Sequence, residues 1–199
     1  SWIGNKPLFG RRLFLFRASH QSDRFSNQAR ALGADVIPMP LLKPQAMSFD
    51  LSLDELRKST ALVFTSVNGV AFFFQAIRKR GIDFRELHHH KLMAIGKGSS
   101  EALSSFGFLP DLVAKESSQE GLFKAIQETY PKKLINKMHF LLPLASNARP
   151  YLEKALSELA ASVRTISVYE TLSLEYTAKP DFKPTDSLIF SSADMVTHF

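Results

Sequence analysis

The spacing of apolar and polar positions in the middle of the chain predicts a buried strand, a polar turn and a helix. The segment Ala61-Leu-Val-Phe-Thr-Ser-Val-Asn-Gly-Val70 begins with apolar residues and continues into hydroxyl and amide side chains. Apolar residues then recur at the i, i+3, i+4, i+7 spacing of one helix face, at Val70, Phe73, Phe74 and Ile77. At the carboxyl end of a parallel strand, such a turn offers hydroxyls and free helix N–H groups. We therefore expect an anionic ligand there.

The same pattern occurs a second time near the end of the chain. Ser187-Leu-Ile-Phe-Ser-Ser-Ala-Asp-Met-Val196 repeats it, with Phe190 in the place of Phe64, an offset of 190 − 64 = 126 residues. Two further pairs of segments are similar at nearly this offset (159 − 32 = 127), namely Leu13–Ser19 with His139–Ser146 and Ala31–Val36 with Glu158–Val163. Similar segments at the nearly equal offsets of 126 and 127 residues indicate a duplicated α/β half and not a short-period solenoid.

Strands and helices are expected to alternate along the chain, which is typical of an α/β fold. The other expected strands are Arg12–Phe16, Asp35–Met39, Lys91–Ile95, Asp111–Ala114, Met138–Leu142 and Val163–Tyr169. Helices are expected at Ser22–Leu32 and Leu51–Lys58, and after Gly69, Ser99, Ser117 and Pro150. Within the first of these helices, Phe25, Ala29 and Leu32 are expected to share one buried face.

Two local patterns refine these elements. Ser117-x-x-Glu120 is interpreted as a capping box that begins a helix. Three prolines, Pro38, Pro40 and Pro44, are expected to break regular structure.

The order of these elements predicts two domains, because the first strand–helix–strand unit ends near Met39 and its natural continuation is the strand at Ser187. We expect an outer domain of residues 1–38 and 175–199, an inserted domain of residues 53–163, and linkers at 39–52 and 164–174. The expected fold is α/β, with two similar doubly wound parallel-sheet (flavodoxin-like) domains, the second inserted into the first, joined by a two-stranded linker. A ligand is expected in the cleft between the two lobes.

Composition excludes several classes of protein. With 45% hydrophobic and 22% charged residues, the chain of 199 residues is an ordinary globular protein. No apolar run reaches the roughly 20 residues that span a bilayer, and no signal-peptide core is present near the N-terminus. The absence of cysteine excludes disulfides, thiolate zinc sites and a cysteine nucleophile. We expect a cytoplasmic protein without a membrane partner.

The net charge of +6 has two interpretations, a solvated basic surface or a polyanionic partner. Basic residues are scattered, and the densest run, Arg78-Lys79-Arg80, lies at an expected helix end, where cations complement the helix dipole. We therefore do not expect nucleic acid as a partner.

Taken together in their order and spacing, several motifs resemble the uroporphyrinogen-III synthase family over essentially the whole chain. They are Pro7-Leu-x-Gly-Arg-Arg-Leu13, Ala31–Pro40, Phe64-Thr-Ser-x-Asn-Gly-Val70, Ala94-Ile-Gly-x-x-Ser-x-x-Ala-Leu103, Leu109-Pro-Asp111, Leu141-Leu-Pro143 and Ser167-Val-Tyr-Glu-Thr171. The resemblance implies a lyase (a hydro-lyase) that cyclises hydroxymethylbilane to uroporphyrinogen III in the inter-domain cleft, with loss of water and inversion of the terminal ring. It implies no metal and no organic cofactor. It also implies a monomer, and it allows a handover of the substrate by the preceding pathway enzyme.

Three departures from the family pattern are present. Leu144 stands where the family has an arginine, and Ser99 stands where it has a threonine. The chain also ends at Phe199, where the family continues with a strand, a second Gly-x-x-Thr turn and a helix. We therefore expect the outer domain to lack its C-terminal part.

The resemblance implies that Tyr169 is the hydrogen-bond donor that assists departure of the substrate hydroxyl, and a packed strand aromatic is the alternative. Candidates for binding the substrate carboxylates are Arg17, Thr65, Ser66, Asn68, Gly96, Lys97, Ser99, Arg149, Ser191 and Ser192. For the hydroxyl and amide residues the alternative role is helix N-capping, and for the basic residues it is an exposed surface position.

Two further patterns have weaker functional interpretations. Gly96-x-Gly98 lacks the third glycine of a dinucleotide fingerprint, so we interpret it as an anion-binding turn. His88-His89-His90 invites a metal site, but adjacent side chains diverge in a loop, so a structural loop is the preferred interpretation. A two-lobed binding protein for a small anionic ligand, without catalysis, is the alternative to the enzyme.

Overall fold

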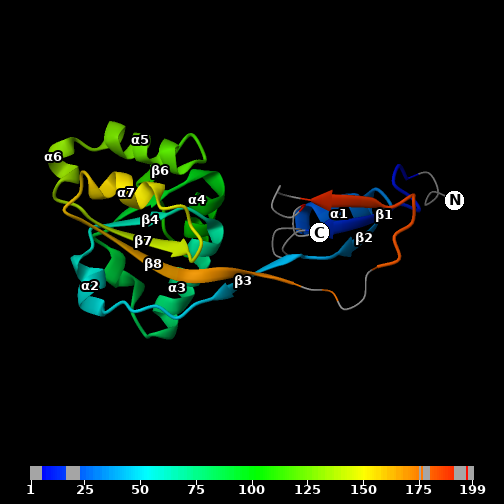
Figure 1. The fold of residues 1–199 in the computed structure, drawn as a ribbon, viewed down its shortest axis with the longest axis horizontal. Coiled ribbons are helices and arrows are strands. Elements are labelled where there is room, and N and C mark those ends of the chain that lie inside the picture. The colour runs from blue at the N-terminus through cyan, green and yellow to red at the C-terminus, as the bar shows by residue number, and fades with distance from the viewer. Residues whose placement is uncertain (1–5, 17–22, 175, 177–179, 191–195, 197–199) are drawn as a thin grey trace. The chain divides into compact units, whose positions relative to one another are not determined.

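The computed structural model describes residues 6–16, 23–174, 176, 180–190 and 196, which belong to two compact units (Figure 1). Unit 1 contains Ser1–Pro44 and Thr171–Phe199, and unit 2 contains Gln45–Glu170. The chain therefore passes between the units twice. Within the described ranges, every helix is too short or too polar to cross a membrane.

Unit 2 is built on a six-stranded sheet with the strand order β3-β8-β7-β4-β5-β6. Its strands are β3 (Leu42–Ala46), β4 (Ala61–Phe64), β5 (Lys91–Ala94), β6 (Leu112–Val113), β7 (His139–Ala145) and β8 (Ser162–Ser173). The pairings that join β8, β7, β4, β5 and β6 are all parallel. Its helices are α2 (Leu53–Lys58), α3 (Val67–Lys79), α4 (Gly96–Ser105), α5 (Gln119–Thr129), α6 (Lys132–Ile135) and α7 (Tyr151–Ser157).

Both faces of this sheet are covered by helices, as alternate residues of the central strand β4 show. Leu62 and Phe64 pack in the cluster that contains the apolar sides of α2, α3 and α4. Ala61 and Val63 point the other way, into the cluster that contains α5, α6 and α7. Figure 1 shows α5 and α7 above the sheet and α2 and α3 below it. Burial on both faces explains why β4 is a continuous apolar run without alternation.

The helix expected after Gly69 is confirmed as α3, which begins at Val67. The four apolar residues of its predicted face, Val70, Phe73, Phe74 and Ile77, are all at most 1% exposed. Gly81, with φ of 72°, follows the helix in the left-handed conformation that ends a helix.

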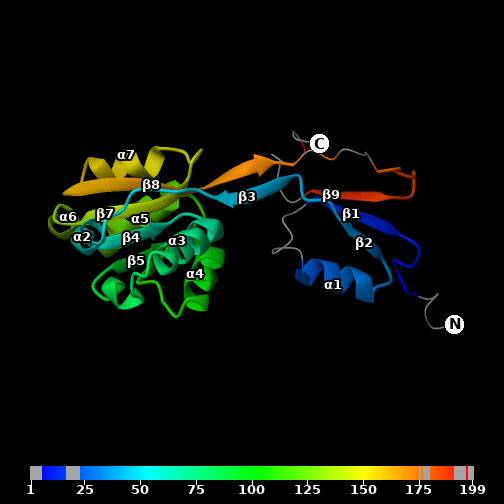
Figure 2. The ribbon, with the colours of Figure 1, turned by 90° about the horizontal axis from the view of Figure 1, so that it is seen from below.

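Unit 1 contains a three-stranded parallel sheet with the order β2-β1-β9, formed by β1 (Arg12–Phe16), β2 (Asp35–Pro38) and β9 (Ser187–Phe190). Helix α1 (Asp23–Ala31) covers one face of this sheet (Figure 2). On that face, Ala29 packs with Leu13 and Leu15. On the other face, Phe16 stacks on Phe190 with 4.7 Å between the ring centroids.

The strand registers of the two units correspond, which supports the duplication seen in the sequence. Arg12 pairs with Asp35 in unit 1, and the residues 127 positions later, His139 and Ser162, pair in unit 2. Likewise Leu13 pairs with Ser187, as Phe140 pairs with Ala61. By strand register Leu13 thus corresponds to Phe140. The sequence comparison matches the segment that begins at Leu13 with the one that begins at His139, one residue earlier.

Two sequence expectations were wrong in detail. Phe25 and Leu32 of the first helix are 38% and 46% exposed, so that of its three predicted inward residues only Ala29 is buried. Pro44 does not break regular structure but lies inside β3. β3 is an edge strand of its sheet, the position in a sheet where proline is tolerated.

Candidate functional site

The strand order of unit 2 reverses between β4 and β7, and a pocket lies at that point. After β4 the chain moves to β5 on one side, whereas after β7 it moves to β8 on the other. In open α/β sheets this switch point is the usual place for a ligand. The pocket, here called the hydroxyl pocket, has a volume of about 290 Å³ and is lined by Thr65, Ser66, Ile95, Ser117, Ser118, Gln119, Ala145, Ala148, Arg149 and Tyr169.

Three helices begin at the hydroxyl pocket, because Ser66, Ile95 and Ser118 are the N-caps of α3, α4 and α5. The serine hydroxyls accept hydrogen bonds from the backbone N–H groups of Gly69 and Gly121, each at 2.9 Å. Ile95 provides no side-chain cap, which leaves the first N–H groups of α4 without a side-chain acceptor from the cap. Helix N-termini favour negative charge, so this rim of the sheet suits an anion.

Tyr169 and Ser66 meet inside the pocket. The Tyr169 hydroxyl lies 3.2 Å from Ser66 Oγ, and the ring stacks on Phe72 with a centroid distance of 5.5 Å. Tyr169 is only 7% exposed. Tyr169 is therefore packed against an aromatic ring, and its hydroxyl is hydrogen-bonded to a protein side chain.

Gly96 occupies a conformation that only glycine adopts easily. Its φ is 74°, and a Cβ atom at this position would overlap the Ser117 side chain. The turn at the start of α4 thus approaches the Ser117 hydroxyl closely, which positions that hydroxyl at the pocket wall.

The predicted capping box at Ser117 was wrong, because α5 has its N-cap one residue later. Ser118 is the N-cap of α5, and Glu120 does not reach back to it. Glu120 instead accepts two hydrogen bonds from the Arg149 guanidinium, at 3.1 and 3.2 Å. This pairing lowers the pKa of the Glu120 carboxyl. The shift of the cap leaves Ser117 free to line the pocket.

Gln119 connects the start of α5, which carries Glu120, to the segment that carries Arg149. Its side-chain oxygen accepts a hydrogen bond from the Leu152 N–H at 3.0 Å, and its side-chain nitrogen donates to the Arg149 carbonyl at 3.2 Å. Because Gln119 is 9% exposed, both bonds form away from solvent. The start of α5 is therefore fixed to the loop before α7.

The family model for uroporphyrinogen-III synthase HemD matches residues 23–199. The chain belongs to this family. It is 29% identical over 115 residues to the porphyrin biosynthesis protein HemD of Ruminiclostridium josui, covering 56% of this chain and 23% of that protein. It is 26% identical over 173 residues to uroporphyrinogen-III synthase of Synechococcus elongatus, covering 85% of this chain and 64% of that protein.

Solved structures of uroporphyrinogen III synthases share the fold. The structure from Helicobacter pylori has a TM-score of 0.59 at 18% identity, covering 95% of this chain and 76% of that one. A mutant from Thermus thermophilus has a TM-score of 0.54 at 20% identity, covering 82% and 64% respectively. The chain thus spans less than two thirds of the length of the curated relatives described above.

Of the site residues predicted for this member of the uroporphyrinogen-III synthase family, the hydroxyl pocket brings together Thr65, Ser66, Arg149 and Tyr169. Asn68, Gly96, Lys97 and Ser99 do not line it. Lys97 is exposed and forms an ion pair with Glu101 at 3.5 Å. Ser99 is 3% exposed and belongs to the first turn of α4. Arg17, Ser191 and Ser192 lie outside the described residues.

Sequence reasoning missed Ser117, Ser118 and Gln119 as pocket residues. The signal was available, since the short apolar strand Leu112–Val113 is followed by a hydroxyl-rich turn and a helix, as Ala61–Phe64 is. The sequence pattern of this turn indicates capping alone, and only the tertiary structure shows that the turn after β6 and the turn after β4 line the same pocket.

The histidine run is placed by main-chain contacts. His90 is buried, and its Nε2 lies 3.0 Å from the Leu56 carbonyl oxygen, which requires a proton on that nitrogen. Its Nδ1 is buried without a hydrogen-bond partner, and burial lowers the pKa of His90 to about 4. Within the part of the chain that is described, no group of three or more His, Asp or Glu residues is arranged to hold a metal ion.

Proposed function

We propose that this chain has uroporphyrinogen-III synthase activity, converting hydroxymethylbilane to uroporphyrinogen III with loss of water and inversion of the terminal ring. Membership of the family supports the proposal. The observation that carries it in this chain is the contact between Tyr169 and Ser66 at the switch point, inside a pocket surrounded by helix N-termini.

The substrate class explains the chemistry of the hydroxyl pocket. Hydroxymethylbilane carries eight carboxylates on a flexible backbone, so the protein has to hold a polyanion in one folded conformation. The starts of α3, α4 and α5 offer hydroxyls and backbone N–H groups for this purpose. When the protein holds the two ends of the open-chain tetrapyrrole together, the reacting atoms are already in a geometry that favours ring closure.

Tyr169 has the role of hydrogen-bond donor to the departing hydroxyl. Ser66 Oγ accepts from the Gly69 N–H, and its own proton is free to point at the Tyr169 oxygen. In that arrangement the Tyr169 proton points away from Ser66 and is available to the substrate hydroxyl. The hydroxyl takes up a proton and leaves as water, and a cationic azafulvene remains, which the terminal ring then attacks. A proton is released again when the macrocycle closes, so the net change is the loss of one water, the reaction of a lyase.

We also propose that the fold consists of two similar doubly wound, flavodoxin-like domains, the second inserted into the first. In chain order, the sheet of unit 1 has the order 2-1-3, since β9 follows β2 in sequence. If β7 and β8 are taken as the first two strands of unit 2, its order is 2-1-3-4-5, with β3 added at the edge. This is the flavodoxin-like order, in a circularly permuted form.

We further propose that the enzyme is monomeric and cytoplasmic and that it receives its substrate from the preceding pathway enzyme. The non-catalytic binding protein, the other interpretation of the sequence, is not favoured by the family match.

The decisive experiment supplies the purified chain with freshly generated hydroxymethylbilane and separates the product isomers by chromatography. Uroporphyrinogen III above the spontaneous type I background is the expected result. A folded chain, shown by circular dichroism, that binds hydroxymethylbilane but yields only type I product would contradict the proposed activity of this chain.

A further inference from the structure

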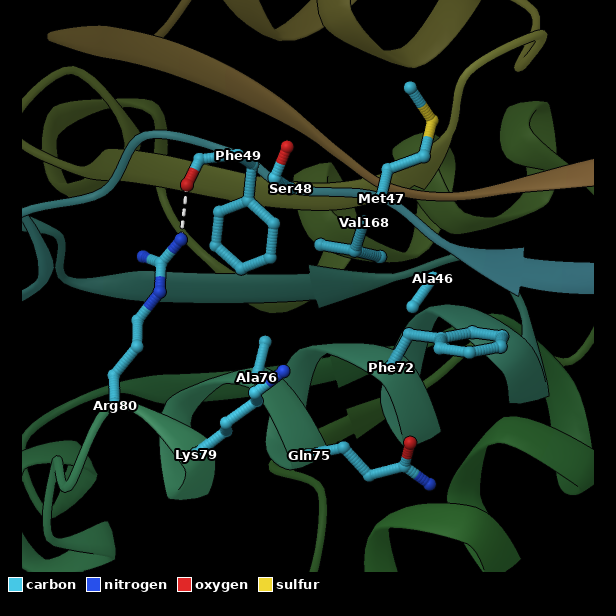
Figure 3. A pocket seen from close by; sticks show the side chains of 10 residues that line it. All are labelled: Ala46, Met47, Ser48, Phe49, Phe72, Gln75, Ala76, Lys79, Arg80 and Val168. Carbon is cyan, nitrogen blue, oxygen red and sulfur yellow. Dashed lines mark hydrogen bonds between the residues drawn. The ribbon is translucent and has the colours of Figure 1, made fainter.

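A second cavity of unit 2 shares no lining residue with the hydroxyl pocket. It has a volume of about 620 Å³, which lies in the range of small-molecule sites. We call it the Lys79 groove, and it is lined by Ala46, Met47, Ser48, Phe49, Phe72, Gln75, Ala76, Lys79, Arg80 and Val168 (Figure 3).

The walls of the groove come from two segments that are far apart in the sequence. Figure 3 shows residues 46–49 on one side and helix α3 on the other, with Val168 of β8 between them. Phe49 and Phe72 contribute aromatic rings to opposite walls. Val168 is 1% exposed and packs in the core cluster, so the groove borders the packed core of unit 2.

The groove carries positive charge. In the described part of the chain, its lining contains Lys79 and Arg80 but no Asp or Glu. The Arg80 guanidinium donates to the main-chain carbonyls of Phe49 and Leu51 and lies 4.3 Å from the centre of the Phe49 ring. Among the residues that the structure describes, neither cation forms an ion pair with a carboxylate.

These features select one class of ligand. An apolar ligand body gains free energy by leaving water and packing against Val168 and the rings of Phe72 and Phe49. A carboxylate head gains at Lys79 and at the N–H donors of Arg80 that the two carbonyls do not use. A cationic head would be repelled by the same side chains.

We propose that the Lys79 groove binds a monocarboxylate with an apolar body, of the size of a medium-chain fatty acid. The site is separate from the proposed reaction and does not depend on it. One side chain connects the two regions, because Phe72 lines the groove and also stacks on Tyr169.

The test titrates the chain with octanoate and follows backbone amide signals by NMR. Signals of Phe72, Ala76 and Lys79 are expected to shift together and to saturate. Lys79→Met is expected to weaken binding about fivefold or more, in line with the loss of a charge-assisted contact of roughly 1 kcal/mol. Lys79→Arg, which keeps the charge, is expected to retain it.

The matched control is Arg78→Met. Arg78 precedes Lys79 on the same helix, is exposed and carries the same charge, but it does not line the groove. It is expected to leave octanoate affinity unchanged. Octylamine, with the same chain length and the opposite charge, is expected not to shift the groove signals.

Three results would overturn the proposal. Equal weakening by Arg78→Met and Lys79→Met would mean that octanoate responds only to the net charge. Equal binding of octylamine would exclude charge recognition. Shifts confined to Ser66 and the residues at 117–119, or no saturable shift below the concentration at which octanoate aggregates, would show that the groove is not a carboxylate site.

Discussion

The hydroxyl of Tyr169 lies 3.2 Å from Ser66 Oγ, although the two residues are 103 positions apart in the chain. Ser66 follows the central strand β4 and caps α3, whereas Tyr169 belongs to β8, two strands away in the sheet. Register shifts between Leu144 and Ala145, so that Ala145 pairs with Tyr169. This irregularity helps to place the phenol at the end of the sheet, where it faces the start of α3.

Replacement of Tyr169 by phenylalanine tests the role of this hydroxyl. Tyr169→Phe is expected to lower type III product formation about 100-fold, because a hydrogen-bond donor to the leaving group is lost. The free energy of unfolding is expected to fall by only about 1 kcal/mol, because the stacked ring remains. The isomer assay and urea unfolding measure the two effects. Tyr151→Phe, the same change at a tyrosine that is 38% exposed, is the control. A loss of activity no greater than the loss of folded protein would assign Tyr169 to packing.

Replacement of Ser66 by alanine separates capping from the tyrosine contact. Ser66→Ala removes the acceptor of the Gly69 N–H and is expected to cost about 1 kcal/mol of stability. Ser52→Ala removes a comparable cap from α2, which does not line the hydroxyl pocket. Thermal unfolding should respond similarly to both, whereas only Ser66→Ala should reduce type III formation. Similar activity of the two variants would leave Ser66 with capping alone.

Gly96 provides a test of the close approach between α4 and Ser117. Gly96→Ala combines a positive φ with overlap of the Ser117 side chain, and we expect a loss of roughly 2–3 kcal/mol in the free energy of unfolding. Gly107→Ala is the matched control, since Gly107 also has positive φ (85°) but no atom within 4 Å of an added Cβ. It should cost only about 1 kcal/mol, the strain of the backbone alone. Equal costs at both sites in urea titrations would contradict the close contact.

Gln119 is expected to position the loop that carries Arg149. Gln119→Leu leaves the Leu152 N–H and the Arg149 carbonyl without their partner, which should cost about 1–3 kcal/mol of stability. Gln119→Glu keeps the acceptor for Leu152 and loses only the donor. We therefore expect it to retain more stability and to raise KM for hydroxymethylbilane more than it lowers kcat. A fall of kcat at constant KM would contradict a positioning role.

His90 makes stability depend on pH between about 6.5 and 4. Burial lowers its pKa to about 4 in the folded protein, so the unfolded chain binds the proton first as pH falls. Stability is therefore complete above about pH 6.5 and decreases towards pH 4, by at most about 3 kcal/mol. Unfolding by urea at several pH values measures the slope. His90→Gln, which keeps a donor for the Leu56 carbonyl, should flatten it, and the exposed His88→Gln should not. An unchanged slope in His90→Gln would assign the pH dependence to other groups.

The spacing of apolar and polar residues along the chain was sufficient to predict the type and position of most helices and strands. The apolar residues of α3 recur at helix spacing because one side of that helix is buried. The residues of β4 are all apolar because both faces of its sheet are covered. The pattern failed at α1, where Phe25 and Leu32 have the correct spacing and remain exposed. Spacing defines a helix face, but which residues of that face meet the sheet depends on how the helix is rotated against it.

For the candidate site, too, the sequence predicted some features and not others. The residues at 65–68 could be selected in advance, because a polar turn after a buried strand is recognisable in the chain itself. The sequence could not predict that Ser66 contacts Tyr169. It also could not predict that Lys97 lies away from the hydroxyl pocket and pairs with Glu101.

The sequence alone therefore determined the α/β class and the presence of hydroxyl-bearing turns, because these depend on neighbours within a few positions along the chain. The tertiary structure decided which turns share a pocket, which serine caps α5, and that Glu120 binds Arg149 instead of completing a capping box. Such contacts join residues that are about 30 to 100 positions apart. They exist only once strand order and register have brought those residues to one edge of the sheet.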